Sequence, residues 1–452
     1  MSNNTVQFNP EYPDTRESER FHRRADGLIP AHCQTLAKGP TQHVDGVAPK
    51  YLQMGKGARV WDVDGNEYLD YTMGVGPLSL GYGHPAVDDA IREQLEQGIV
   101  FSLVHPLEVD VSELIREVIP NAEMVRFSKT GADVTSAAVR LARAYTGRDR
   151  VLCCGYHGWH DWYIGVTPRR AGVPAAVQDL VSTFAYNDLD SVRAGLDADT
   201  ACVILEPMTF ESPREGFLQE LKALCAANGT LLIFDEMWTG FRLDVGGAQR
   251  YFDVTPDLAC YSKAVANGMP LAVLTGRAEV MSLLDEAVFF FTTFGGEALS
   301  LAAARATIAE LRRLDVPAWM ARQGRKLIDG YNHLARVAGL EDVTRCVGHP
   351  ARTMVTFDAT AADPLLQKSF VQQELIRHGI LWSGFHNVSY SHGDADIAWT
   401  LEAYGAVLPL LKAALEAGDL GERLRGRPVQ PVFRKADGFN TRPRRAAGVA
   451  AK

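Results

Sequence analysis

The chain has 452 residues, which is too long for one simple core, because single cores usually stop growing at roughly 250 to 300 residues. Apolar residues make up 46% and charged residues 22%, which excludes a wholly disordered chain and is typical of a globular protein. The net charge of −9 offers no positive field to nucleic acid or an anionic membrane, so we expect small-molecule partners.

Seven scattered cysteines show no C-x-x-C spacing, which predicts neither a disulfide framework nor a zinc site. The N-terminal region has no apolar segment of the signal-peptide type, and no stretch approaches the roughly 18 apolar residues of a membrane span. We therefore expect a cytoplasmic protein that is neither exported nor embedded in a membrane, and we expect no metal.

Early in the chain, residues 58–72 (ARVWDVDGNEYLDYT) contain two alternating apolar runs separated by Asp64-Gly65-Asn66. Alternation interrupted by this turn chemistry predicts a β-hairpin. From about Gly81 onward, helical patterns alternate with short apolar runs, which predicts an α/β fold with a mostly parallel sheet between helices. The apolar runs are MVRFS, RVLCCG, ACVILEP, TLLIFDE, LACYS and LAVLTG.

Beyond roughly residue 320 the pattern changes to long amphipathic helices around short strands, which indicates a smaller α+β domain. We expect residues 1–75 to form an N-terminal segment and part of this small domain, and residues 76–320 to form the large domain. Residues 321–433 complete the small domain. The basic segment 434–452 has no apolar periodicity, and we expect a flexible tail there.

Three apolar runs end in ionisable side chains. TLLIFDE ends in Asp235 and Glu236, ACVILEP leads into Glu206, and the run 257–263 ends in Lys263. Since parallel strands place their carboxyl ends at one edge of a sheet, these side chains should lie along the same edge. Burial favours the neutral amine of a lysine, so Lys263 is a candidate nucleophile for a carbonyl, the alternative being a solvated lysine at a strand end.

A second group of residues lies where MVRFS runs into a helical pattern. Thr130 and Asp133 have the spacing of a helix capping box, and Gly131 allows close backbone approach. The first turn could bind a phosphate, or it could be a helix cap alone. Lys129-Thr130 also resembles part of a nucleotide-binding P-loop, but position 124 is Met where that motif needs Gly, which excludes it.

Aromatic residues follow the run RVLCC in the segment GYHGWHDWY. Tyr156, Trp159 and Trp162 could stack on a flat heteroaromatic ring or could simply pack. His157 and His160 lack a third ligand at a suitable spacing, so a metal site is not indicated.

Several motifs in this order resemble class III, fold-type I aminotransferases that depend on pyridoxal 5'-phosphate (PLP), in the group similar to glutamate-1-semialdehyde aminomutase. The likeness runs from about Gly57 to the end of the chain. It rests on GARVWDVDGNEYLDY, VRLARAYTGRD, GYHG, IFDEMWTGFR, YSKAVANGMP and TTFGGEALSLAAA. The resemblance implies a large domain with a mostly parallel seven-stranded sheet and a smaller α+β domain built from both termini.

The resemblance also implies roles for individual residues. Lys263 would hold PLP as a Schiff base and move the proton during catalysis, and Asp235 would pair with the pyridine nitrogen. Glu206 would handle the donor substrate. Further cofactor contacts would come from Thr130, Gly131 and Ala132 at the phosphate, from Tyr156 and Met237 on the two ring faces, and from His157. Thr293 would reach the phosphate of a neighbouring subunit, which implies a homodimer with active sites at the interface.

This sequence departs from the aminomutase pattern at positions expected to contact the substrate. Val75 replaces an expected tryptophan, and Lys129, Glu211 and Glu297 stand where asparagines are usual. A wider and more polar acceptor pocket follows. Residues 29–42 replace the aminomutase segment that helps to hold the substrate carboxylate.

The sequence therefore predicts a ping-pong aminotransferase that takes an amino group from an amino acid, L-glutamate in the first instance. The acceptor would be a polar ketone or aldehyde, such as a keto-cyclitol, keto-sugar or dehydroshikimate-like ketone of secondary metabolism. The expected acceptor contacts are Val75, Lys129, Glu211, Phe385, His386 and Asn387. A 2,1-aminomutase and a non-catalytic PLP-binding protein are the alternatives.

Overall fold

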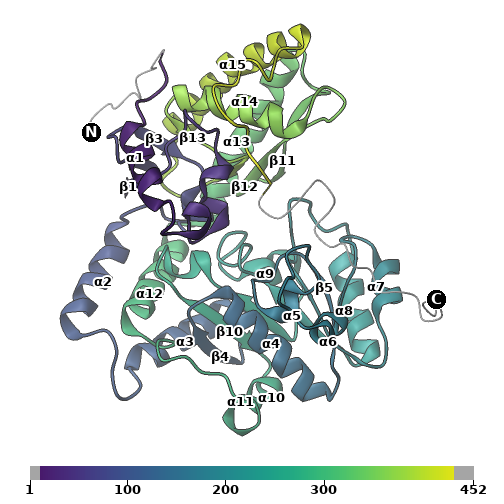
Figure 1. Ribbon diagram of the computed structural model, residues 1–452. Helices are drawn as coiled ribbons and strands as arrows, with labels where there is room; N and C mark the ends of the chain where they lie inside the picture. The colour runs from purple at the N-terminus through teal and green to yellow at the C-terminus, as the bar shows by residue number, and fades with distance from the viewer. Residues whose placement is uncertain (1–10, 432–452) are drawn as a thin grey trace. The chain divides into compact units, whose positions relative to one another are not determined.

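The computed structural model describes residues 11–431 and divides into two compact units. Residues 85–317 form one of them, here called the central unit. Residues 11–84 and 318–431 form the other, here called the terminal unit (Figure 1). The expected flexible tail, residues 434–452, lies outside the described residues.

A seven-stranded sheet organises the central unit, in the order β4-β10-β9-β8-β7-β5-β6. Only β10 runs antiparallel to its neighbours, so the expected mostly parallel sheet is confirmed. The strands are β4 (Met124–Ser128), β5 (Arg150–Cys154), β6 (Val181–Thr183), β7 (Thr200–Leu205), β8 (Leu231–Asp235), β9 (Leu258–Tyr261) and β10 (Ala272–Gly276).

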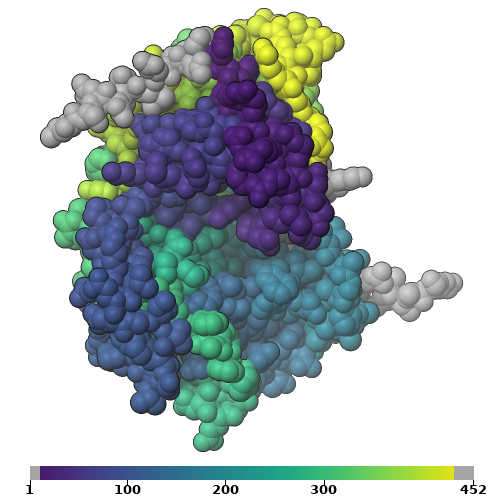
Figure 2. All heavy atoms as spheres, turned by 60° about the vertical axis from the view of Figure 1, so that its left-hand side comes forward, coloured from purple at the N-terminus to yellow at the C-terminus, as the bar shows by residue number. Residues whose placement is uncertain are grey.

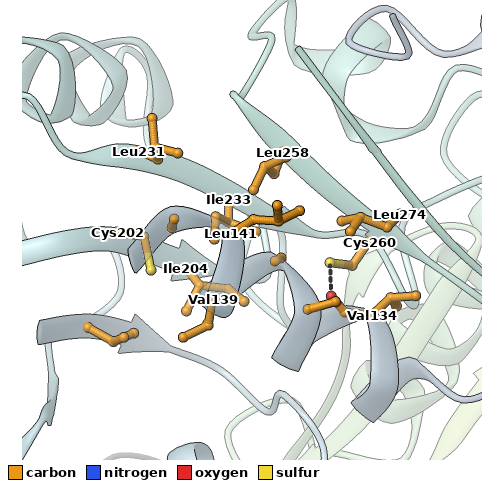
Figure 3. Packing of buried hydrophobic residues seen from close by; sticks show 14 of the residues in the cluster. Val134, Val139, Leu141, Cys202, Ile204, Leu231, Ile233, Leu258, Cys260 and Leu274 are labelled. Carbon is orange, nitrogen blue, oxygen red and sulfur yellow. Dashed lines mark hydrogen bonds between the residues drawn. The ribbon is translucent and has the colours of Figure 1, made fainter. Parts of the chain in front are cut away.

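Helix α4 (Gly131–Thr146) packs against β7, β8, β9 and β10 and covers the middle of this sheet. Its buried side chains Val134, Val139 and Leu141 meet Ile204 and Ile233 from the strands (Figure 3). Such strands are apolar throughout because a parallel sheet is covered on both faces. The other helices of this unit are α2 (Pro85–Gln97), α3 (Pro106–Val118), α5 (Asp161–Ile164), α6 (Ala175–Asp179), α7 (Leu189–Gly195), α8 (Phe217–Asn228), α9 (Gly247–Phe252), α10 (Ala278–Met281), α11 (Leu283–Glu286) and α12 (Ala298–Arg313).

One sheet of the terminal unit contains strands from both the N-terminal and the C-terminal parts of the chain. β2 (Arg59–Asp62) and β3 (Glu67–Asp70) form the expected hairpin, and β1 (Leu52–Lys56) pairs with β2. On its other side, β3 pairs in parallel with β13 (Ile380–Leu381). A second, antiparallel sheet contains β11 (Thr344–His349), β12 (Arg352–Phe357) and β14 (Phe385–Asn387). The longer helices are α1 (Arg16–Ala25), α13 (Val316–Val337, which begins in the central unit), α14 (Pro364–Arg377) and α15 (Asp394–Ala417).

Three further observations describe what the fold contains. Among the described residues, no group of three or more His, Cys, Asp and Glu side chains could hold a metal ion. Within residues 11–431 no helix is both long enough and apolar enough to cross a membrane. All seven cysteines are thiols, and six of them are buried.

Candidate functional site

The carboxyl ends of neighbouring strands bring three ionisable residues to one edge of the central sheet. Asp235 is the last residue of β8 and pairs in register with Cys260 of β9, three positions before Lys263. Glu206 directly follows β7, the neighbour of β8 on its other side. The parallel pairing of these three strands is what gathers the three side chains at one edge.

Asp235 and His157 form a buried pair at this edge. The Asp235 carboxylate Oδ2 lies 2.8 Å from Nδ1 of His157, and both side chains are almost completely excluded from solvent. On the opposite side of the ring, Nε2 lies 3.1 Å from the carbonyl oxygen of Cys154, which can only accept a hydrogen bond. The other carboxylate oxygen of Asp235, Oδ1, accepts the backbone N–H of Met237 at 3.0 Å.

The Glu206 carboxylate is buried away from solvent. Burial raises its pKa, and the negative charge of Asp235 raises it further. Its Oε1 accepts the backbone N–H of Tyr156 at 2.8 Å, and the positive charge of Lys263 acts in the opposite direction on the same pKa. Glu206 and Lys263 are therefore close enough to interact electrostatically.

Lys263 begins the short 3₁₀ turn Lys263–Ala266 that follows β9, and its backbone is left-handed, with φ of +46°. A non-glycine residue in this region is uncommon and often marks a functional position. The preceding hydroxyl of Ser262 donates to the carbonyl of Leu271 at 2.6 Å, which ties the turn to the start of β10. The local backbone thus fixes the direction in which Lys263 leaves the sheet.

The amino end of α4 has the expected capping box. Thr130 Oγ1 accepts the Asp133 N–H at 3.3 Å, and Asp133 Oδ2 accepts the Thr130 N–H at 2.8 Å. Within the described part of the chain, the N–H groups of Gly131 and Ala132 have no hydrogen-bond acceptor. Two unsatisfied donors at the positive end of a 16-residue helix form a site for an anion.

Two glycines leave room beside this helix end. A Cβ on Gly131 would lie 2.7 Å from Sδ of Met237, and one on Gly158 would lie 2.7 Å from Cβ of Ala132. Met237 therefore packs directly against the anion site. Tyr156 is 40% exposed and rests edge-to-face on Tyr163, with ring centroids 5.6 Å apart.

The other aromatic residues of this segment have structural partners. His160 Nδ1 and Trp162 Nε1 both contact the hydroxyl of Ser136 on α4, at 2.7 and 3.0 Å. Trp159 is 70% exposed. The sequence allows two interpretations of these aromatic side chains, stacking on a ligand ring or packing within the fold. The contacts of His160 and Trp162 support packing.

Lys129 and Glu297 form an ion pair of 2.8 Å beside the amino end of α4. The Lys129 ammonium also donates to the carbonyl of Pro270 at 3.0 Å, while Glu297 accepts the N–H groups of Leu299 and Ser300 at the start of α12. Burial raises the pKa of Glu297, but the hydrogen bonds from Lys129 and Ser300 outweigh it and the net pKa is lowered. The pair therefore links three segments of the central unit: the residue after β4, the segment before β10 and the start of α12.

Asn187 is a residue that the sequence did not single out. Its side-chain Nδ2 donates to Oε1 of Glu211 at 2.9 Å and to the carbonyl of Ser212 at 3.1 Å, and its Oδ1 accepts the N–H of Arg214 at 2.8 Å. Its backbone is left-handed, with φ of +62°, and it is buried. Asn187 thus holds the exposed segment that carries Glu211. The only sequence feature that could have indicated this role is an Asn followed by an Asp just after a strand.

Thr293 is exposed and lies in an apolar segment of the central unit. Phe289, Phe291 and Phe294 are 75, 62 and 56% exposed, and Leu103 and Val104 are 85 and 82% exposed. We call these five side chains the apolar patch. The blue segment near residue 100 and the green segment near residue 290 both lie on the surface turned toward the viewer in Figure 2.

The remaining expected substrate contacts lie in the terminal unit. Val75 is half-buried in the turn after β3, and Phe385 is half-buried at the start of β14. His386 is completely buried, and its two ring nitrogens contact Thr353 Oγ1 at 2.6 Å and the Tyr404 hydroxyl at 2.8 Å. The ring of His386 therefore offers no exposed surface to a ligand in this conformation.

Comparison with known proteins identifies the chemistry to which this arrangement belongs. Residues 42–391 match the family described as aminotransferase class-III. The chain belongs to the class III aminotransferases. It is 37% identical over 412 residues to a 3-aminobutyryl-CoA aminotransferase of Cloacimonas acidaminovorans, an alignment that covers 88% of this chain and 98% of that protein.

Two further relatives refine the placement. A glutamate-1-semialdehyde 2,1-aminomutase of Desulforamulus reducens is 36% identical over 352 residues, covering 73% of this chain and 80% of that protein. The solved structure of the PLP internal aldimine form of the FumI protein from Sphingopyxis sp. MTA144 superposes with a TM-score of 0.82 at 26% identity, covering 92% of this chain and 99% of that one. The protein is a fold-type I transaminase of the group similar to the aminomutase, and its cofactor is PLP.

The residues at this edge of the sheet fit PLP. PLP carries a phosphate, and the N–H groups of Gly131 and Ala132 form an anion site that lacks an acceptor among the described residues. A flat ring with a basic nitrogen suits a buried carboxylate such as Asp235 and a partly exposed aromatic ring such as that of Tyr156. The aldehyde needs a primary amine, and Lys263 follows the strand next to Asp235.

Proposed function

We propose that this transaminase moves an amino group from an amino acid donor, L-glutamate in the first instance, to a polar ketone or aldehyde. The observation that carries the proposal is the gathering of Lys263, Asp235 and Glu206 at one sheet edge that also has an anion site at the start of α4. The thiol state of all seven cysteines suits a cytoplasmic enzyme. Secondary metabolism is the setting we propose for the acceptor.

Each residue at the sheet edge has a proposed role. Lys263 would hold PLP through its primary amine and, when that amine is free, would take the proton from the substrate carbon. Asp235 pairs with the ring nitrogen, and His157 fixes the orientation of Asp235 through the 2.8 Å contact. PLP, when bound, supplies an acceptor for the electrons left by deprotonation.

Cofactor contacts beyond the reacting atoms are proposed for five further positions. Thr130, Gly131 and Ala132 bind the phosphate at the amino end of α4, while Tyr156 and Met237 cover the two faces of the ring. The 2.7 Å approach of Met237 Sδ to the Cβ position of Gly131 supports its placement against the same ligand. Glu206, whose pKa is raised by burial, positions the donor substrate next to Lys263.

A polar acceptor is supported by the side chains around the amino end of α4. Lys129 and Glu297 form a charged pair there, and Asn187 holds Glu211 in place. A carboxylate that is already paired can accept hydrogen bonds from hydroxyl groups of a ligand, and a paired ammonium can donate to them, without leaving an unpaired buried charge. A keto-cyclitol, a keto-sugar or a dehydroshikimate-like ketone offers such hydroxyl groups.

We further propose a homodimer in which the apolar patch meets a second copy and Thr293 reaches the partner's cofactor phosphate. Large apolar side chains exposed to this degree are candidates for burial in an interface between proteins. The patch flanks Thr293 in the sequence at Phe291 and Phe294. Light scattering on the holoenzyme tests this, and a monomer at micromolar concentration would contradict it.

The experiment that tests the function separates the two halves of the reaction. Borohydride reduction followed by peptide mass analysis should place the pyridoxyl group on Lys263. Incubation with L-glutamate should then release 2-oxoglutarate and change the cofactor spectrum, and the aminated enzyme should react with members of a ketone panel. Lys263→Ala should abolish both halves; turnover by that variant would overturn the proposal.

A 2,1-aminomutase is the second candidate, because a relative with that name is 36% identical to this chain. The same experiment distinguishes the two. An aminomutase would release no 2-oxoglutarate from L-glutamate and would convert a single amino-aldehyde. A protein without a borohydride-reducible group would instead be a non-catalytic PLP-binding protein.

A further inference from the structure

Residues 262–271, here called the lysine turn, lead from β9 through Lys263 to the antiparallel strand β10. Lys263 and Asn267 both have left-handed backbone, with φ of +46° and +42°. Residues other than glycine are strained in this region, although asparagine adopts it more readily than lysine does. A strained turn keeps its shape only where surrounding groups restrain it.

Side chains restrain the lysine turn at its last two carbonyl groups. The Ser262 hydroxyl donates to the Leu271 carbonyl at 2.6 Å. The Pro270 carbonyl accepts two hydrogen bonds, from Lys129 Nζ at 3.0 Å and from Ser300 Oγ at 3.1 Å. A carbonyl oxygen has two lone pairs, so both of these bonds can form together. Pro270 is therefore the point at which a residue beside the anion site and a residue of α12 both contact the lysine turn.

Glu297 keeps the Lys129 ammonium in this position. Its Oε1 lies 2.8 Å from Lys129 Nζ, and the Glu297 and Lys129 side chains are 9 and 17% exposed. Glu297 is itself held, because its carboxylate accepts the N–H groups of Leu299 and Ser300 at the start of α12. Hydrogen bonds between charged groups are shorter and stronger than those between neutral groups. The ammonium is thus fixed between α12 and the lysine turn, and it is mostly shielded from solvent.

The backbone at Lys129 leads directly into the anion site. The next residue, Thr130, caps α4, and its N–H donates to Asp133 Oδ2 at 2.8 Å. The Lys129 side chain therefore links the start of α4 to the turn that begins beside Lys263. PLP carries its phosphate and its aldehyde on one small ring, so the groups that bind them must be held at a fixed separation.

We propose that Lys129 and Glu297 are positioning residues that hold the lysine turn at the correct distance from the anion site. A cofactor bound by its phosphate at the start of α4 then presents its aldehyde to the amine of Lys263. This inference rests on the proposed attachment of PLP to Lys263. It goes further by giving the ion pair a role toward the cofactor, exerted through the carbonyl of Pro270.

Two forms of the cofactor separate this role from a simple effect on the anion site. PLP and pyridoxamine phosphate share the ring and the phosphate, but only PLP has the aldehyde that can bond to Lys263. In full-length Lys129→Met, the dissociation constant of PLP should rise about tenfold, and that of pyridoxamine phosphate less than about twofold. Equilibrium dialysis of the apoenzyme measures both constants. An equal rise for the two ligands, or no rise for either, would overturn the proposal.

Glu297→Gln tests the partner with a smaller change, since glutamine keeps an acceptor for the start of α12. A loss of affinity that is selective for PLP is expected here too, and this variant decides the question if Lys129→Met does not fold. Because the two residues act as a pair, the double variant should lose no more PLP affinity than Lys129→Met alone. Losses that add in the double variant would contradict the pairing.

Arg305→Met is the matched control. Arg305 also lies in α12, and its ion pair of 3.2 Å with Asp110 of α3 includes no residue of the lysine turn or the anion site. Both dissociation constants should stay within about twofold of the wild-type values, because the pair is largely exposed. A selective loss of PLP affinity in this variant would mean that any weakened contact of α12 has the same effect, which would overturn the role given to Lys129.

Borohydride reduction of the wild-type holoenzyme separates this inference from the proposed function. A pyridoxyl group found elsewhere than on Lys263 would show that the proposed role of Lys263 is wrong, and this inference would fall with it. A pyridoxyl group on Lys263, together with unchanged PLP affinity in Lys129→Met and Glu297→Gln, would overturn this inference alone.

Discussion

Nδ1 of His157 lies 2.8 Å from Oδ2 of Asp235, and neither side chain is accessible to solvent. Removal of the imidazole would leave a buried carboxylate without one of its partners, which costs about 1–3 kcal/mol. We therefore expect His157→Asn to slow the half-reaction with L-glutamate by roughly 10- to 100-fold.

The measurement is the rate of the spectral change on mixing with L-glutamate. His160→Asn is the control, because His160 lies in the same segment but contacts Ser136 instead of the sheet edge. An unchanged rate in His157→Asn, with normal cofactor content, would show that Asp235 does not need this partner.

Gly158 should be essential for cofactor retention. A Cβ at this position would lie 2.7 Å from Cβ and 3.0 Å from Cα of Ala132, so Gly158→Ala should push the first turn of α4 out of place. We expect the dissociation constant of PLP to rise at least about tenfold, or about 1.4 kcal/mol.

Gly172→Ala is a matched control for this effect, and equilibrium dialysis measures both. Gly172 is also left-handed, with φ of +88° against +103° for Gly158, but a Cβ there would meet nothing within 4 Å. If the two variants bind PLP with equal affinity, any loss of affinity comes from backbone strain and not from displacement of the anion site.

The stability of the protein should depend on pH through Glu236. Burial raises the pKa of Glu236 from 4.5 to about 7. Because the folded state holds this proton more tightly, the group stabilises the fold fully below pH 4.5, and this contribution is lost as the pH rises through 7. Relative to Glu236→Gln, the wild-type free energy of unfolding should fall by about 3 kcal/mol from pH 4.5 to 8.

Thermal midpoints of both proteins across this pH range provide the check. Glutamine keeps the acceptor for the Thr239 hydroxyl and the Ala248 N–H at the position of Oε2, and it loses only the 3.2 Å hydrogen bond from the Gln249 N–H to Oε1, a loss that does not depend on pH. Parallel profiles for the two proteins would mean that Glu236 does not titrate in this range.

Asn187 should matter for the acceptor and not for the donor. Asn187→Ala removes all three hydrogen bonds to the segment that carries Glu211, so the acceptor half-reaction should weaken about tenfold in kcat/KM. Asn187→Asp keeps the acceptor for the Arg214 N–H but repels the Glu211 carboxylate, and it should be impaired at least as much. Normal acceptor kinetics in both variants would remove Glu211 from the proposed contacts.

Much of the fold could be predicted because the evidence is local. Alternation around Asp64-Gly65-Asn66 predicts the β2–β3 hairpin, and apolar runs separated by helical patterns predict the parallel sheet. The gathering of Asp235, Glu206 and Lys263 also follows from local pattern, because parallel strands end at a common edge.

The partners of individual side chains could not be predicted in this way. Lys129 pairs with Glu297, and Asn187 with Glu211, across separations that no periodicity encodes. His386 lies in the short strand β14 and resembles a site residue in sequence, but its neighbours Thr353 and Tyr404 come from elements whose packing depends on the whole terminal unit. Such contacts are tertiary, so local sequence carries no trace of them.

The distribution of the seven thiols makes the native enzyme suitable for labelling at a single position. Six cysteines are buried, and burial raises the pKa of Cys202 and of Cys346 to about 12, so very little thiolate is present to react. Cys33 alone is half-buried. A maleimide dye should therefore couple with a stoichiometry near one per chain before unfolding, which would let fluorescence follow the N-terminal part of the terminal unit without any substitution.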